Sequence, residues 1–95
     1  MVLTPLRFEE IIFEGRVQGV GFRMTSVRHA RHHELLGWVR NDARGTVTAR
    51  IHGHPRAIEA WLESMERSLP GHVDRLKRRE IPGTDEFTSF RILRG

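Results

Sequence analysis

The 95-residue sequence predicts one α+β domain in which two helices cover one face of an antiparallel sheet. Segments rich in β-forming residues and segments with apolar residues at helical spacing follow one another in the order βαββαβ. Turns that contain glycine or proline separate these segments. The length agrees with a single domain spanning residues 1–95, because a typical domain has ~100–150 residues.

The first part of the chain predicts a strand, a glycine-rich loop and a helix. The strand lies between Arg7 and Val17, where bulky apolar residues are frequent. The helix is expected from about Phe22 to Leu35, with a weak apolar stripe at helical spacing. The stripe consists of Met24, Val27 and Ala30.

A hairpin follows this helix. Its two strands are expected at Leu36 to Asn41 and at Thr46 to His52. In the second strand apolar and polar residues alternate more regularly than anywhere else in the chain, which is typical of a half-buried strand. The turn covers residues 42–45, and Gly45 is expected to take a positive φ there.

The second half of the chain predicts a helix and two strands. Pro55 opens the helix at its favoured first position, and Leu69-Pro70-Gly71 ends it. Its strong core-facing stripe consists of Ile58, Trp61, Leu62, Met65 and Leu69. Strands are expected from Val73 to Ile81, which is very basic, and from Phe87 to Leu93. This order of elements predicts a ferredoxin-like βαββαβ sandwich with a short extra C-terminal strand.

The composition narrows the function classes. The chain has no cysteine, so disulfides and thiol chemistry do not contribute. Residues 1–5 lack the pattern of a signal peptide, and no stretch is apolar enough to span a membrane, so we expect a cytoplasmic monomer. The net charge of +4 comes almost wholly from arginine. Coding bias in a GC-rich genome, attraction of anionic substrates and nucleic-acid binding are three possible reasons for it.

The segment Gly15 to Arg23 has the composition of a phosphate-binding loop. Gly19 and Gly21 can take positive φ without steric cost, so successive backbone N–H groups can point to one place. Arg23 follows where helical spacing begins, and its guanidinium is expected beside the positive end of a helix dipole. The segment is neither a Walker A loop nor a GxGxxG dinucleotide motif. A tight strand-to-helix connection is the alternative interpretation of such a turn.

A second motif covers residues 37–47 and reads Gly-Trp-Val-Arg-Asn-Asp-Ala-Arg-Gly-Thr-Val. Together, the two segments closely resemble the signature patterns of the acylphosphatase family, GxVQGVxFR and GWVxNxxxGxV. The chain matches every fixed position of both patterns. As an arrangement of elements, the resemblance extends over nearly the whole chain.

The resemblance implies hydrolysis of the carboxyl-phosphate bond of a small-molecule acyl phosphate, without a metal or organic cofactor. Matched by motif, Arg23 corresponds to the phosphate-binding arginine and Asn41 to the water-orienting asparagine. The backbone amides of the phosphate cradle correspond to Gln18, Gly19, Val20, Gly21 and Phe22. One departure is that His33 and Glu34 stand where the family commonly ends its first helix with Leu-Gly.

The residues themselves support such a reaction. No serine belongs to a recognisable nucleophile motif, and the carboxylates form no evident acid/base pair. An acyl phosphate needs neither, because its leaving group is a carboxylate with a pKa of about 4. Phosphoryl transfer then depends mainly on positioning and charge stabilisation. Asn41 can orient a water without becoming charged, and its alternative role is to form the hairpin turn.

Other functions stay open from the sequence alone. A non-catalytic anion- or partner-binding module would keep the same cradle. An RNA-recognition sheet needs exposed aromatic residues on a central strand, and Thr46 to His52 has none, so no specific nucleic-acid partner is expected. Acylphosphatase-like domains also occur at the N-terminus of large hydrogenase-maturation carbamoyltransferases, although 95 residues favour a stand-alone protein.

Three histidines of the first helix and the two tryptophans are further candidate site residues. His29 and His33 lie four residues apart, a spacing that can bind zinc, and His32 lies between them. No further ligand completes the set, so a solvated helix surface is expected. Trp61 is expected in the core, and Trp38 at the core or partly lining the site.

Overall fold

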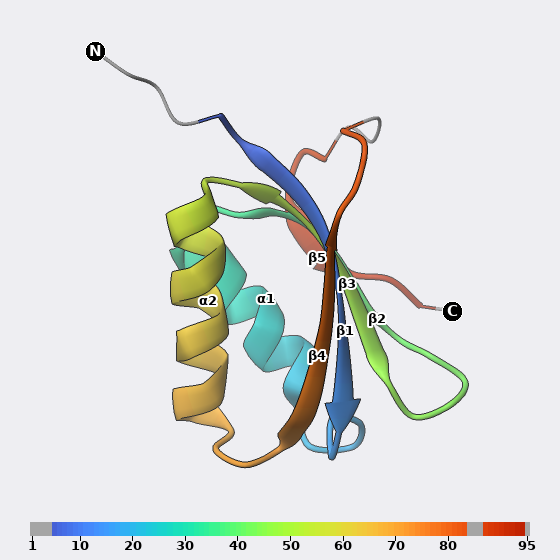
Figure 1. Ribbon diagram of the computed structural model, residues 1–95. Helices are drawn as coiled ribbons and strands as arrows, with labels where there is room; N and C mark the ends of the chain where they lie inside the picture. Colours follow the sequence, from blue (N-terminus) through green and yellow to red (C-terminus); the bar gives the residue numbers. More distant parts are fainter. Residues whose placement is uncertain (1–4, 84–86, 95) are drawn as a thin grey trace.

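The structure, a computed structural model, describes residues 5–83 and 87–94, so residues 1–4, 84–86 and 95 of the predicted domain lie outside it. Both helices lie on the same side of the sheet (Figure 1). The predicted ferredoxin-like sandwich with its extra C-terminal strand is confirmed. The elements are β1 (Arg7–Gly15), α1 (Phe22–His32), β2 (Leu36–Asn41), β3 (Val47–Gly53), α2 (Pro55–Ser68), β4 (Val73–Glu80) and β5 (Phe90–Ile92).

The five strands are hydrogen-bonded in the order β4-β1-β3-β2-β5. β3 is antiparallel to both of its neighbours, β1 and β2, and β4 is antiparallel to β1. The expected antiparallel sheet therefore comprises four strands. The C-terminal strand departs from it, because the chain crosses to the other edge of the sheet and β5 then pairs parallel with β2.

The hydrophobic core lies between the sheet and the two helices. The apolar stripe predicted for α2 is confirmed. Its buried members are Ile58, Trp61 and Met65, and the partly buried members are Leu62 and Leu69. The Trp61 indole is fully buried, and its Nε1 donates a hydrogen bond to the Ser26 carbonyl at 3.0 Å. This bond joins α2 to α1 inside the core.

The stripe predicted for α1 is partly wrong. Ala30 is buried and Val27 packs against the core, whereas Met24 is 69% exposed. Successive helical residues are rotated by about 100°, so a helix that begins with Phe22 facing the core points Met24 away from it. Phe22 and Ser26 take the core positions instead, and the Ser26 hydroxyl donates to the Phe22 carbonyl at 2.7 Å.

Helix α1 ends at a left-handed residue that is not glycine. Glu34 has a φ of 57°, which lies in a backbone region that residues other than glycine rarely adopt. Its amide donates to the Arg31 carbonyl at 3.1 Å, and the Leu35 amide donates to the Ala30 carbonyl at 2.9 Å. These are the two bonds of a Schellman motif, whose left-handed position is usually glycine. The residues His33 and Glu34 thus end the helix in the usual way, with backbone strain at residue 34.

Replacing Glu34 with glycine should stabilise the protein, because glycine takes this φ without steric strain. The strain is about 1–2 kcal/mol, and the greater freedom of glycine in the unfolded chain offsets part of it. We therefore expect urea unfolding to give a free energy of unfolding higher by roughly 0.5–1 kcal/mol. Glu34→Ala keeps a Cβ and is the control. A Glu34→Gly protein no more stable than this control would contradict the strain.

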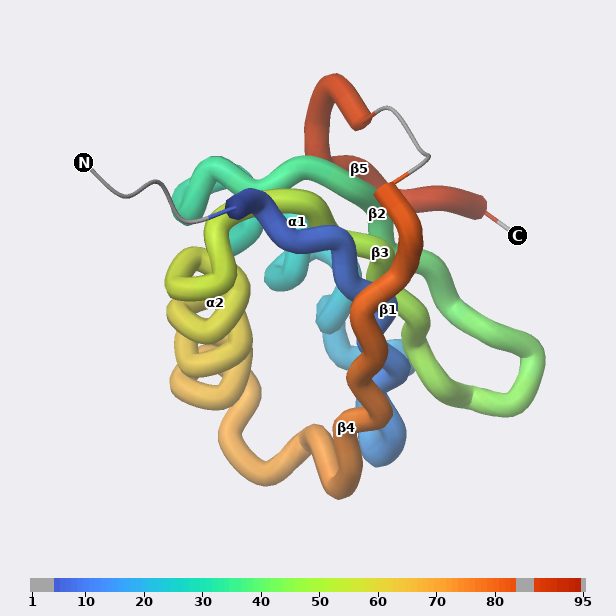
Figure 2. The backbone as a smooth tube through the Cα atoms, turned by 45° about the horizontal axis from the view of Figure 1, so that its top comes forward, coloured from blue at the N-terminus to red at the C-terminus, as the bar shows by residue number. Residues whose placement is uncertain are grey.

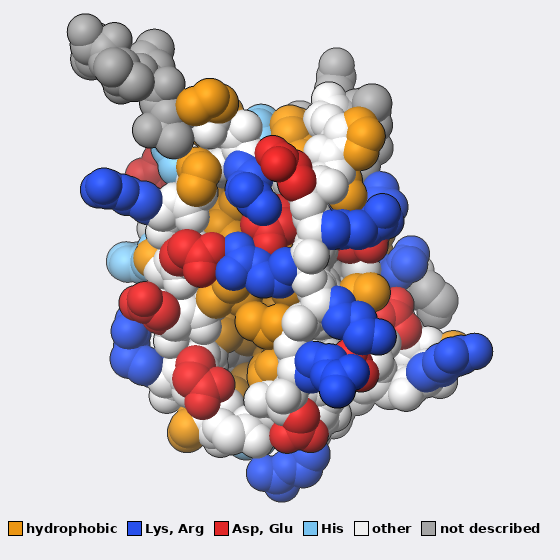
Figure 3. Space-filling view, viewed as in Figure 1, with side chains coloured by type: hydrophobic (Ala, Val, Ile, Leu, Met, Phe, Trp, Pro, Cys, Tyr) orange, Lys and Arg blue, Asp and Glu red, His pale blue; other side chains and the backbone are white. Residues whose placement is uncertain are grey.

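Strand β4 is an edge strand that is open on the helix side. All of its residues except Val73 are exposed. The register of β4, which the sequence does not define, shifts between Glu14 and Gly15 of β1. A hollow separates β4 from α2, and its lining includes the apolar side chains of Phe13 and Met65. Figure 3 shows this apolar floor between acidic and basic side chains.

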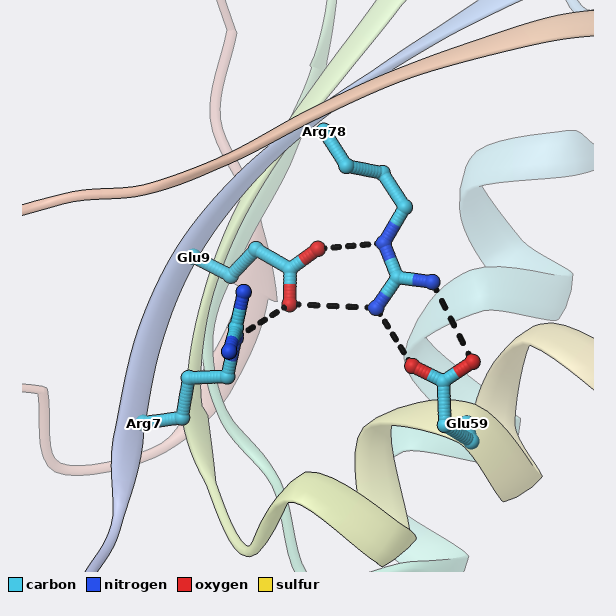
Figure 4. Close-up of polar contacts among 4 residues, drawn as sticks. All are labelled: Arg7, Glu9, Glu59 and Arg78. Atoms are coloured by element: carbon cyan, nitrogen blue, oxygen red, sulfur yellow. Dashed lines mark hydrogen bonds and ion pairs between the residues drawn. The ribbon is translucent and has the colours of Figure 1, made fainter.

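One arginine crosses the hollow and joins three elements. Arg78 of β4 donates hydrogen bonds to the carboxylates of Glu9 in β1 and Glu59 in α2 (Figure 4). Glu9 is fully buried, and Arg7 donates a further hydrogen bond to it at 3.0 Å. A buried carboxylate is tolerated only when such partners are present. The hydrogen bond from Arg78 also holds the pKa of Glu59 below its usual value.

Candidate active site

The loop between β1 and α1, which is the predicted cradle of backbone N–H groups, leads directly into the N-terminus of α1. Gly19 and Gly21 both have a φ of 75°, as the sequence predicts. Gly21 is also the N-cap of α1, and no side chain caps this helix end. The first N–H groups of α1 therefore stay available to an anion, and the helix dipole adds positive potential there. A Cβ on either glycine would meet no atom within 4 Å, so both positions need glycine for its φ.

Arg23 lies in the first turn of α1, beside the cradle. Its guanidinium makes no hydrogen bond or ion pair with any residue that the structure describes. It lines a cavity of about 640 Å³, and the described residues of the cavity walls include two arginines and no carboxylate or histidine side chain. The cavity therefore favours an anion. Its lining residues are Val17, Gly19, Gly21, Phe22, Arg23, Met24, Asn41, Ile92, Leu93 and Arg94.

Asn41 is the last residue of β2 and lines the same cavity as the first residues of α1. Its Oδ1 atom is buried and accepts no hydrogen bond from a described residue. Buried polar atoms in proteins are nearly always hydrogen-bonded, because an unpaired one carries its full desolvation penalty. The Asn41 amide oxygen thus lacks the hydrogen bond that such an atom usually has, in a residue that lines the cavity.

Asp42, rather than Asn41, organises the hairpin turn. Its carboxylate accepts hydrogen bonds from the hydroxyls of Thr46 at 2.9 Å and Thr48 at 2.6 Å. Its amide donates to the Thr46 carbonyl at 2.9 Å, and its carbonyl accepts from the Gly45 amide at 3.2 Å. Gly45 has the predicted positive φ, at 89°. The side chain of Asn41 takes no part in these bonds.

The Gln18 side chain joins the cradle loop to the hairpin. Its Nε2 donates to the carbonyls of Asp42 at 2.8 Å and Thr46 at 2.9 Å, both at the base of the hairpin loop. Figure 2 shows this loop projecting from the side of the molecule opposite α2. The sequence indicates only a backbone role for Gln18, because nothing in a glycine-rich motif identifies carbonyl partners more than twenty residues away.

The structure brings most of the predicted site residues to one cavity. Arg23 and Asn41 both line it. The predicted cradle residues are divided. Those that line the cavity are Gly19, Gly21 and Phe22, and those that do not are Gln18 and Val20.

Five lining residues were not predicted as part of the site, and one of them is Val17, which directly precedes the predicted cradle. Met24 was assigned to the core of α1, and Ile92, Leu93 and Arg94 lie at the far end of the sequence. Their place follows from the pairing of β5 with β2, which the Leu93 amide extends by donating to the Val39 carbonyl at 2.9 Å. The sequence shows the apolar residues Ile92 and Leu93 next to Arg94. Their position beside β2, and therefore at the cavity, can be known only from the fold.

The two histidines at zinc-compatible spacing connect the helices. His29 and His33 make hydrogen bonds with Ser68 at 2.6 Å and Ser64 at 3.1 Å, both in α2. The helix surface that was expected to be solvated is therefore also a contact between the two helices. Burial, together with nearby cationic side chains, lowers the pKa of both histidines. Within residues 5–83 and 87–94, no group of three or more His, Cys, Asp or Glu residues could hold a metal ion.

The two tryptophans lie on opposite faces of the sheet. Trp61 is buried in the core, as predicted. Trp38 does not line the cavity but lies on the face away from the helices. The guanidiniums of Arg40 and Arg50 are 5.2 and 5.7 Å from its ring centroid.

In the described part of the chain, neither helix is long and apolar enough to cross a membrane.

Known proteins share both the sequence and the fold. A sequence model of the acylphosphatase family matches residues 9–92. The acylphosphatase of Bacillus licheniformis is 40% identical over 83 residues, which cover 86% of this chain and 92% of that protein. The crystal structure of acylphosphatase from Bacillus subtilis has a TM-score of 0.83 and 31% identity, and the match covers 94% of this chain and 99% of that one.

A longer protein contains the same fold. HypF from T. kodakarensis has a TM-score of 0.76 and 27% identity, covering 94% of this chain but only 12% of its own. The small relatives, by contrast, match over nearly their whole length. Because the family model spans most of the chain and the relatives agree with it in sequence and fold, the chain belongs to the acylphosphatase family of hydrolases.

Proposed function

We propose that the cavity hydrolyses acyl phosphates by direct attack of a water molecule on phosphorus. Family membership supplies the activity, and the roles of the individual residues are the proposal. Arg23 and the backbone amides of residues 18–22 hold the phosphate, and Asn41 holds the water. The observation that supports it is that Arg23 and Asn41 line one cavity beside the cradle, and that neither the guanidinium nor the buried amide oxygen has a partner among the described residues.

The lining residues suit a reaction that needs little proton transfer from the protein. Among the described residues that line the cavity, none has a carboxylate, histidine or hydroxyl side chain. The water oxygen bonds to phosphorus, the bond from phosphorus to the acyl oxygen breaks, and the carboxylate leaves with the electron pair. A phosphate oxygen of the substrate accepts the proton of the water. Arg23 and the amides stabilise the charge spread over the equatorial oxygens of the loose transition state.

The proposal includes the setting in which the protein acts. We propose that the protein acts as a monomer, because the mechanism assigns every role to residues of one chain and requires none from a second copy. The chain contains no cysteine and needs no oxidising compartment to fold, which supports a cytoplasmic location. The proposed mechanism uses no metal or organic cofactor and no nucleic-acid partner.

Arg23 and Asn41 should separate in a kinetic test with benzoyl phosphate. Arg23→Ala should abolish hydrolysis and raise the Ki of inorganic phosphate, because the guanidinium binds phosphate in the ground state and in the transition state. Asn41→Ala should lower kcat by roughly 10²–10³-fold and leave that Ki nearly unchanged, because water is held only for the attack.

Arg28→Ala is the matched control, since Arg28 is an exposed arginine on the same helix. It should change neither constant. An Asn41→Ala protein that kept its kcat but unfolded more easily would assign Asn41 to the hairpin turn and contradict its role with water.

Gln18 supports the mechanism through its side chain. The cradle and the end of β2 are separate segments, and their relative position determines the distance from water to phosphorus. The two hydrogen bonds from Gln18 Nε2 fix the hairpin loop that directly follows Asn41. We therefore assign Gln18 as a positioning residue for Asn41.

Gln18→Leu removes both hydrogen bonds while keeping the size of the side chain. A shift of about 1 Å in a reacting group can cost ~10²-fold in rate, so kcat should fall roughly 10–10²-fold with an unchanged Ki for inorganic phosphate. Gln18→Glu also lacks a donor for the two carbonyls, and its charge should additionally raise the Ki. A Gln18→Leu protein with the wild-type kcat would show that the hairpin is positioned without this residue.

A further inference from the structure

The cavity is much larger than a phosphate group. A phosphate fills the space of roughly three or four water molecules, about 100 Å³. The cavity has a volume of about 640 Å³. Most of it therefore lies beyond the cradle, on the side where the rest of a substrate would extend.

Apolar side chains line this outer part. Met24 projects from the first turn of α1 and is 69% exposed, so the core does not account for it. Ile92 and Leu93 lie beside β2 and line the cavity. The hydrogen bond from the Leu93 amide to the Val39 carbonyl holds this segment in place. An exposed methionine opposite an apolar segment at the mouth of a cavity is typical of a site that binds an apolar group.

A second arginine lies at the end of this apolar segment. Arg94 lines the cavity, and its side chain has no hydrogen bond or ion pair with a described residue. The parallel register pairs Val39 with Ile92, so the chain after Ile92 runs toward the level of Asn41. A guanidinium is planar and stacks well on the face of an aromatic ring. Together, an apolar wall and a guanidinium without a partner among the described residues favour a flat aromatic group over a small aliphatic one.

We propose that Met24, Ile92, Leu93 and Arg94 form an acyl-binding subsite that selects acyl phosphates with an aromatic acyl group. The inference rests on the proposed function, because it takes the phosphate of the same substrate to lie in the cradle. It adds a substrate class that the cradle cannot select, since every acyl phosphate carries the same phosphate group.

Two phosphonates that cannot be hydrolysed test the subsite. In 2-oxo-2-phenylethylphosphonate a CH₂ group replaces the bridging oxygen of benzoyl phosphate, and 2-oxopropylphosphonate is the matching analogue of acetyl phosphate. Calorimetry should show the phenyl compound binding the wild-type protein about tenfold more tightly, the effect expected from burying one ring face. Met24→Ser, Leu93→Ser and Arg94→Gln should each reduce this ratio toward one. The affinity for inorganic phosphate should stay within about twofold in Met24→Ser and Leu93→Ser.

Leu76→Ser is the matched control, because Leu76 is a partly exposed leucine on β4 that does not line the cavity. It should keep the wild-type ratio. A wild-type ratio near one, or a ratio unchanged in both Met24→Ser and Leu93→Ser, would overturn the subsite while leaving the proposed function intact. Failure of both phosphonates and of inorganic phosphate to bind the wild-type protein would overturn the cradle itself, and the subsite with it.

Discussion

The antiparallel pairing of β3 with both β1 and β2 is the constraint on which the site depends. Because β1 and β2 both run opposite to β3, they run in the same direction and their C-terminal ends lie at the same end of the sheet. The loop after β1 is the cradle, and the loop after β2 is the hairpin that follows Asn41. Two motifs that are separate in sequence are therefore brought together by strand order, before any side chain contributes. The two hydrogen bonds of Gln18 then fix the remaining freedom between them.

Several of the positive charges of this chain pair with carboxylates away from the site. On the sheet face away from the helices, Arg50 and Arg79 both pair with Glu10 at 3.0 Å, and Lys77 pairs with Glu14 at 3.6 Å. Burial tends to raise the pKa of Glu10, but the hydrogen bonds from the two arginines hold it below its usual value. The arginines of the cavity differ, because their guanidiniums have no partner among the described residues. Their charge is thus available to an anionic substrate.

The sequence predicts well where the helices and strands lie and which backbone conformation the motif glycines adopt, because each of these depends on local chemistry. Glycine at φ 75° in the cradle and the apolar stripe of α2 are local properties that composition and spacing reveal. Met24 was misplaced because a weak stripe does not define how a helix is rotated about its axis. The buried carboxylate of Glu9 could not be foreseen, since its partner Arg78 comes from β4, 69 residues later.

Long-range pairing also explains what the sequence does not show of the site. The side chain of Gln18 and the position of Arg94 depend on which strands lie side by side. Glu34 shows the opposite case, in which a local rule names glycine but the fold holds a glutamate in the same left-handed conformation. The rule for helix ends therefore predicts the backbone conformation at this position, but it does not determine which residue adopts that conformation.

Attack of water on phosphorus, rather than on the acyl carbon, is the central claim of the proposed mechanism. It is tested most directly by hydrolysing benzoyl phosphate with the wild-type protein in water enriched in ¹⁸O and analysing both products by mass spectrometry. Attack on phosphorus transfers the labelled oxygen to inorganic phosphate and leaves benzoate unlabelled. Label in benzoate instead of phosphate would show that the water reaches the acyl carbon, and it would contradict the placement of the phosphate between Arg23 and the water held by Asn41.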